Sequence, residues 1–237
     1  MNATIAKITA RGLFGRKRVF LLIPLPVLLI GVATLARLSP ARPDEWGPAV
    51  IVGLGFAAVL PVIALVVGTG VLGSEIDDGT LTHVLAKPLP RSEIVLTKLA
   101  VSAGITTAVA GLPLFVVGLL AGSAPVAFAL VAAAAIGSVA YSALFLAMSL
   151  LSRRPVLVGL VYVVLWEGVL GNLLTGSRQL SIEQYVITIA DWLAPSDLLD
   201  GAVSVPVSFV MAVAFMVGMT ALAVQRLRSF SVAGETG

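Results

Sequence analysis

Residues 49–72 read AVIVGLGFAAVLPVIALVVGTGVL, an apolar run without a single charged side chain. About 20 apolar residues in an α-helix, at 1.5 Å per residue, cross a hydrocarbon core roughly 30 Å thick. The whole chain has the same character, because 59% of its 237 residues are hydrophobic and only 11% are charged. So few charges cannot cover the surface of a soluble domain. We therefore predict an all-α integral membrane protein.

Further apolar blocks of this kind recur along the chain, and residues 1–237 form one expected transmembrane domain. The first block follows the basic stretch GRKRVF, residues 15–20, as a secretory signal would. No clear small-residue cleavage site follows it, so we count it as a span. The six expected spans are about 19–36, 49–72, 94–121, 125–151, 155–174 and 205–225.

The distribution of basic residues supports six spans with both termini in the cytoplasm. With that topology the outer side carries only Arg37, Arg42 and Arg178, and the other 12 of the 15 lysines and arginines are cytoplasmic. An excess of Lys and Arg in cytoplasmic segments is the usual orientation signal. Because these charges lie at the ends of apolar runs, the net charge of +3 does not indicate a nucleic-acid partner. The absence of cysteine excludes disulfides and thiolate metal sites.

Residues 4–18 predict a short amphipathic helix at the membrane surface before the first span. Three basic residues share one face and three apolar residues lie roughly opposite, as in helices that rest in the interface. A plain basic tail that only sets the topology is the alternative. The residues concerned are Lys7, Arg11 and Arg18 on one face, and Ile5, Ile8 and Leu13 on the other.

A second short helix is predicted on the outer side at SIEQYVITIADWL, residues 181–193. Ser181 and Gln184 have the spacing of a capping box, which satisfies the first amides of a helix. Apolar residues follow at helical spacing on one stripe, and Pro195 stops the helix. The segment is too short and too polar to span, so we expect an interfacial or partly re-entrant helix. The stripe consists of Ile182, Tyr185, Val186, Ile189, Trp192 and Leu193.

The segment EIDDGTLTHVLAKPLPR, residues 75–91, places charges and two prolines between the second and third spans. Its possible ligands, Glu75, Asp77, Asp78 and His83, lack the spacing of a calcium loop and have no second histidine. We therefore expect no metal site, and His83 is better explained as a surface residue. The chain also lacks a G-x-S-x-G motif and a carboxylate pair within its spans, so no catalytic residue is predicted.

A partner-binding helix explains this segment better. Leu81, Val84 and Leu85 share one small apolar face, and Pro88 and Pro90 then end the helix. An exposed apolar face on the cytoplasmic side needs a protein partner or the membrane surface to cover it. A plain polar connector is the alternative.

In its order of residues, this segment resembles the cytoplasmic segment of ABC-2-type transporter permeases. That family has a Glu, then Gly-Thr-Leu, a small apolar helix, Pro, Arg, and a span that begins near a Lys. Six spans, a basic amphipathic N-terminus and an outer helix between spans five and six also agree. The matching positions are Glu75, Gly79, Thr80, Leu81, Leu85, Pro88, Arg91 and Lys98.

The resemblance implies the permease subunit of an ATP-driven ABC exporter in a bacterial inner membrane. Glu75, Gly79, Thr80, Leu81, Val84, Leu85, Pro88 and Arg91 would then contact a separate ABC ATPase, and two permease copies in the bilayer would form the path. No G-x-x-x-x-G-K-[ST] motif occurs in the chain, so ATP and Mg²⁺ would bind to the ATPase and this chain would hold no cofactor. The substrate, the identity of the ATPase, and whether the second permease is identical, stay open.

Glu167 is a carboxylate inside the fifth expected span, about 13 residues beyond Arg154 and hence roughly 20 Å along a helix. Such a group is costly in a membrane unless it is paired, protonated or facing water. We consider two roles, a polar group in the translocation path or its outer gate, and a hydrogen-bonded packing residue. If Glu167 relays protons, the chain could instead be a proton-driven secondary transporter. A non-transporting membrane scaffold or enzyme is the third possibility.

Overall fold

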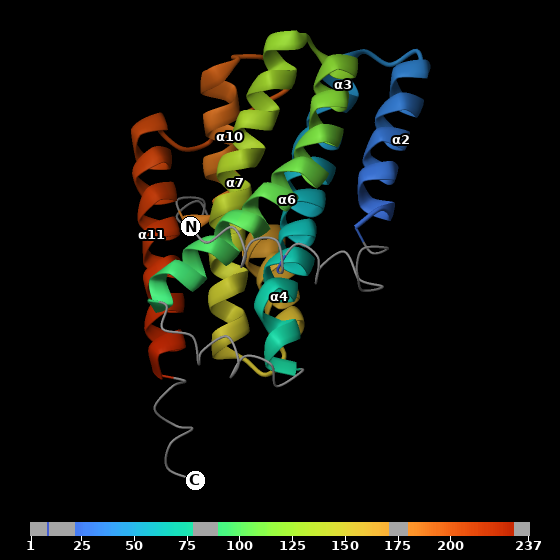
Figure 1. Ribbon diagram of the computed structural model, residues 1–237. Coiled ribbons are helices and arrows are strands. Elements are labelled where there is room, and N and C mark those ends of the chain that lie inside the picture. The colour runs from blue at the N-terminus through green and yellow to red at the C-terminus, as the bar shows by residue number, and fades with distance from the viewer. Residues whose placement is uncertain (1–8, 10–21, 78–89, 171–179, 230–237) are drawn as a thin grey trace.

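The described residues of the computed structural model, which are 9, 22–77, 90–170 and 180–229, form an all-helical bundle (Figure 1). This confirms the predicted fold class. Prolines stand in the first turn of several helices, where a missing N–H costs nothing. The elements are α2 (Pro24–Leu38), α3 (Pro43–Pro48), η2 (Ala49–Val59), α4 (Leu60–Asp77), α6 (Arg91–Ala121), α7 (Ala124–Leu151), α8 (Pro155–Val161), η3 (Tyr162–Leu170), α10 (Ile182–Leu193) and α11 (Val205–Ser229).

Four helical stretches are long and apolar enough to cross a membrane: Pro43–Val71, Arg91–Ala121, Ala124–Leu151 and Val205–Ser229. They match the expected spans at 49–72, 94–121, 125–151 and 205–225 closely. The chain is therefore a multi-pass membrane protein. The expected first and fifth spans correspond to shorter apolar helices, Pro24–Leu38 and Pro155–Val169. Both expectations extend into residues outside the described part, so the count of six remains a prediction.

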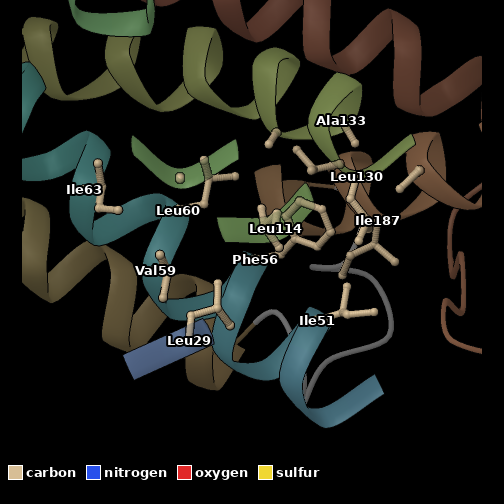
Figure 2. Close-up of a cluster of buried hydrophobic side chains, with 14 of the residues drawn as sticks. Leu29, Ile51, Phe56, Val59, Leu60, Ile63, Leu114, Leu130, Ala133 and Ile187 are labelled. Atoms are coloured by element: carbon tan, nitrogen blue, oxygen red, sulfur yellow. The ribbon is translucent and has the colours of Figure 1, made fainter. Parts of the chain in front are cut away.

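Helix α7 is the centre of the bundle and packs against α4, α6, α10 and α11. Helices α2 and α11 lie at opposite edges in Figure 1. Helices α6 and α7 form a hairpin in which a Cβ on Gly118 would come within 2.6 Å of the Ala127 Cα. Small residues allow such close helix contact in membranes. The main core lies between these helices, and Figure 2 shows part of it around Phe56, Leu60 and Leu114.

Two segments, η2 and η3, are π-helical and contact each other. At the end of η2 the Leu60 N–H bonds to the Gly55 carbonyl five residues back. Such wide turns are uncommon and are frequently found at functional sites. They bring residues five positions apart onto one face of the helix. This spacing positions the site described below, because η3 carries Glu167.

The ends of the bundle differ in charge. The lower end in Figure 1 contains the end of α4, the start of α6, the α7–α8 turn and the end of α11. The described arginines of these segments are Arg91, Arg153, Arg154, Arg226 and Arg228. The upper end contains the α2–α3 turn, with Arg37 and Arg42. Most of the described arginines therefore lie at one end of the bundle, as the sequence predicted.

Candidate functional site

Glu167 lies inside the bundle and is only 1% exposed. Its first partner is Tyr162, which precedes it by one π-helical turn in η3. The Tyr162 hydroxyl donates a hydrogen bond of 2.9 Å to Glu167 Oε1. An ordinary α-helical turn places residues three or four apart on one face, so the five-residue spacing depends on the π-helix. The local backbone thus provides one donor for this buried carboxyl group.

The N-terminus of α10 provides the other donors. The Ser181 hydroxyl donates to Glu167 Oε2, and the Ile182 N–H donates to Glu167 Oε1 at 3.1 Å. Nearby, the Trp166 Nε1–H donates to the Leu180 carbonyl oxygen at 3.4 Å. First-turn amides of a helix have no partner within the helix and favour a carboxylate. Glu167 therefore joins η3 to the start of α10 through a side chain.

Ser181 is the N-cap of α10, as predicted, since its Oγ accepts from the Gln184 N–H at 3.3 Å. Within the described residues, no return bond runs from the Gln184 side chain to the Ser181 N–H, so only half of the capping box forms. The Ser181 hydroxyl hydrogen is directed to Glu167 instead. The bonds of Glu167 thus complete the cap.

Helix α10 is buried on every side from Ile182 to Ala190, including the polar residues Glu183, Gln184 and Thr188. Trp192 and Leu193, the last two residues of the predicted apolar stripe, are exposed. An interfacial helix would leave its polar face to solvent. Helix α10 instead packs against α7, α11 and η2 inside the bundle. The position of this helix at the outer side of the membrane, interfacial or partly re-entrant, stays a prediction.

Two more polar groups lie near Glu167. The Tyr141 hydroxyl of α7 is fully buried and interacts with Glu167, although it makes no hydrogen bond of ordinary geometry among the described residues. Glu183, in the first turn of α10, is also buried and interacts electrostatically with Glu167. The cluster formed by Glu167, Tyr162, Ser181, Tyr141 and Glu183 is called the Glu167 cluster below.

A second buried polar contact lies at the lower end of the bundle. Lys98 of α6 is fully buried, and its Nζ donates a 2.8 Å hydrogen bond to the Val71 carbonyl oxygen of α4. A buried ammonium group is costly unless it is paired or hydrogen-bonded. Lys98 thus ties α4 to α6 close to the segment that connects them. The sequence marked Lys98 only as a match to the family pattern, and nothing in it indicated complete burial.

Most of the predicted ATPase-contacting residues lie outside the described part of the chain. These are Gly79, Thr80, Leu81, Val84, Leu85 and Pro88; Thr9 alone is described from the predicted N-terminal helix 4–18. The backbone of Glu75 belongs to the last turns of α4, and Arg91 is the first residue of α6. The structure therefore places the two ends of the 75–91 segment at the lower end of the bundle and leaves the helix itself a prediction. Among the described residues, no group of three His, Asp or Glu side chains could hold a metal ion.

Comparison with known protein families gives a match to a family of transporter proteins. A family model described as ABC-2 family transporter protein matches residues 16–170, which is more than half of the chain. The matched region contains the 75–91 segment, Lys98 and Glu167, and it ends before α10. Comparison with curated proteins gives no match.

Proposed function

The chain belongs to the ABC-2 family of transporter proteins, and from this premise we propose that it is the permease subunit of an ATP-driven exporter. Subunits of this family are typically non-catalytic. Two copies, or this chain and a related one, form the translocation path in a bacterial inner membrane. A separate ABC ATPase binds ATP and Mg²⁺ and drives the path between its inward and outward states.

The observation that supports coupling is the position of the two ends of the 75–91 segment. These ends belong to α4 and α6 at the arginine-rich lower end of the bundle, and both helices pack directly against the central α7. A displacement of this segment by the ATPase would therefore be transmitted to α7, at the centre of the bundle, through two helices. The hydrogen bond from Lys98 of α6 to Val71 of α4 joins these helices a few residues beyond the two ends of the segment. We assign the ATPase contact to the face made by Leu81, Val84 and Leu85.

The experiment for this function is the double substitution Leu81→Ala with Leu85→Ala in the complex of permease and ATPase. Truncating a buried interface anchor commonly costs about 2 kcal/mol or more. We expect the ATPase to be largely lost when the permease is affinity-purified. Substrate-stimulated ATP hydrolysis should fall with it. Size-exclusion chromatography should show the same amount of folded permease.

A matched control is Leu119→Ala, which shortens an exposed leucine at the other end of α6, 28 residues beyond Arg91 and hence roughly 40 Å along the helix. This variant should keep the ATPase. If the Leu81/Leu85 double variant also retains full ATPase association and transport, the segment is only a connector. The coupling role would then be wrong, whatever the family of the chain.

The proposed topology has six spans, with both termini in the cytoplasm and the α10–α11 connection outside. The chain has no cysteine, so single cysteines can be introduced directly. Asp197 and Arg153 are exposed and lie in the α10–α11 and α7–α8 connections. Asp197→Cys should react with an impermeant thiol reagent in intact cells, whereas Arg153→Cys should react only after the membrane is opened. Labelling of both from the same side would contradict six spans.

Glu167 serves as a gate residue in this proposal. It is covered by its own chain, so we assign it the role of holding α10 against η3 near the outer half of the path. Release of α10 would loosen the outer end of the bundle. Substrate contact is not required for this role.

A further inference from the structure

A pocket of about 250 Å³ lies between η2, α10 and the connection from α10 to α11, toward the upper end of the bundle (Figure 1). The end of α3 packs tightly beside it, since a Cβ on Gly47 would come within 2.6 Å of Leu198 Cδ2. The walls are mostly apolar and include Val52 and Ile187. An apolar lining with a few polar groups is typical of ligand sites. The polar groups of this upper pocket belong to Gln184, Asp197 and Asp200.

Gln184 supplies the polar group at the covered end of the upper pocket. The residue is only 8% exposed, and its backbone N–H bonds to Ser181 Oγ. Its side-chain amide makes no hydrogen bond among the described residues, yet the amide is not one of the fully covered polar atoms. The small exposed part of Gln184 therefore includes this amide, and it faces the pocket that the residue lines. Burying an amide without a partner costs free energy, so this amide is available to a ligand.

The two aspartates make the open end of the upper pocket negative. Asp197 and Asp200 are exposed, and within the described part of the chain neither carboxylate forms an ion pair or a hydrogen bond. Both ionisable residues of the lining are acidic. Clefts lined by charges of one sign concentrate ions of the opposite sign. The same sign prevails among the described residues of the upper end, where Asp44, Glu45, Asp191, Asp197 and Asp200 outnumber Arg37 and Arg42.

An organic cation fits this lining better than a metal ion. Calcium takes about six to eight oxygen ligands, whereas the upper pocket offers two carboxylates and one amide. Among the described residues, no group of three His, Asp or Glu side chains could hold a metal ion. The apolar walls instead require an occupant with an apolar body. The pocket is smaller than the roughly 300–1,000 Å³ of sites for drug-sized ligands, so this occupant is small.

We propose that the upper pocket binds a small organic ammonium compound that carries a second hydrogen-bonding group at the far end of an apolar body. The ammonium group lies at the carboxylates of Asp197 and Asp200, and the body packs against Val52 and Ile187. The second polar group bonds to the Gln184 amide. Binding of this kind does not depend on ATPase coupling. With the topology proposed above, the pocket opens on the outer side of the membrane.

Isothermal titration calorimetry of the purified full chain in detergent tests the proposal with three probes of similar shape. Tyramine has both polar ends, tyrosol has a neutral alcohol in place of the ammonium group, and phenethylammonium lacks the phenol hydroxyl. Tyramine should bind most tightly to wild type. Replacing Asp197 and Asp200 together with asparagine should weaken tyramine binding about tenfold, as two exposed ion pairs allow, and leave tyrosol binding unchanged. The matched control replaces Asp44 and Asp191 with asparagine, since both lie at the same end but do not line the pocket.

Gln184→Leu tests the covered end of the pocket. It should weaken tyramine binding about fivefold and leave phenethylammonium binding unchanged, because it removes one hydrogen bond to the ligand. The thermal unfolding midpoint without ligand should not fall, since this amide has no hydrogen-bond partner among the described residues.

Three results would overturn the proposal. Undetectable tyramine binding, or equal binding of tyramine and tyrosol to wild type, would show that the upper pocket does not select an ammonium group. Equal losses in the two asparagine double variants would assign the effect to surface charge. Displacement of tyramine by micromolar calcium would assign the carboxylates to a metal ion.

Discussion

Replacing Glu167 with leucine should leave little folded protein. Leucine fills a similar volume but accepts no hydrogen bond, so the hydroxyls of Tyr162 and Ser181 and the N–H of Ile182 all lose their acceptor. Each buried donor left unsatisfied costs about 1–3 kcal/mol. The loss would also separate α10 from η3. We expect a thermal unfolding midpoint in detergent well below that of wild type and a strongly reduced yield.

Two tyrosines near Glu167 give a matched pair of controls. Tyr162→Phe removes a hydroxyl that donates a 2.9 Å hydrogen bond to Glu167, whereas Tyr141→Phe removes a buried hydroxyl whose interaction with Glu167 lacks ordinary hydrogen-bond geometry. We expect the first to destabilise the protein by about 1 kcal/mol. The second should have a smaller effect. Equal stability of Glu167→Leu and wild type would show that the Glu167 cluster does not hold α10 in the membrane-embedded protein.

Glu167→Gln separates the structural role from a role in transport. Glutamine keeps one carbonyl acceptor, so part of the network survives and the complex should assemble. A changed transport rate or substrate range in this variant would support a position at the gate or in the path. Unchanged transport at normal yield would restrict Glu167 to packing.

The helix boundaries could be read closely from the sequence because membrane spans are defined by composition. The expected span 125–151 corresponds to Ala124–Leu151, and 94–121 corresponds to Arg91–Ala121. Charges and prolines stand at these ends, where the backbone leaves the apolar layer. The same reasoning identified residues 181–193 as a short helix capped by Ser181. These helix boundaries follow from the length and polarity of each segment, and predicting them does not require knowing which helices pack against one another.

The hydrogen-bond partners within the Glu167 cluster could not be predicted in this way. Ser181 follows Glu167 by 14 residues, and the approach of α10 to η3 depends on how both pack against the rest of the bundle. The periodicity of apolar residues in the sequence also gave no indication of the π-helical turn that brings Tyr162 to Glu167. For this reason the sequence left two roles open for Glu167. It likewise gave no sign that the Lys98 ammonium group would bond to a carbonyl 27 residues earlier.

Lys98→Met should uncouple the ATPase while leaving the bundle assembled. Methionine retains most of the apolar stem but cannot donate to the Val71 carbonyl oxygen. Hydrogen bonds to charged groups contribute about 1.5–3 kcal/mol. The packing of α6 against α7 does not involve this bond, so we expect the bundle to stay assembled. The ends of α4 and α6 would then move independently when the 75–91 segment is pushed.

The expected result is a loss of substrate-stimulated ATP hydrolysis of about tenfold or more, since 1.4 kcal/mol corresponds to a factor of ten. The ATPase itself should still co-purify, in contrast to its loss from the Leu81/Leu85 double variant. Thr97→Val is the matched control, because Thr97 is the buried neighbour of Lys98 and its hydroxyl has no hydrogen-bond partner among the described residues. That variant should transport normally. Full coupling in Lys98→Met would show that α4 and α6 transmit the motion without this bond, and the segment between them would have to act through the packing of α6 on α7.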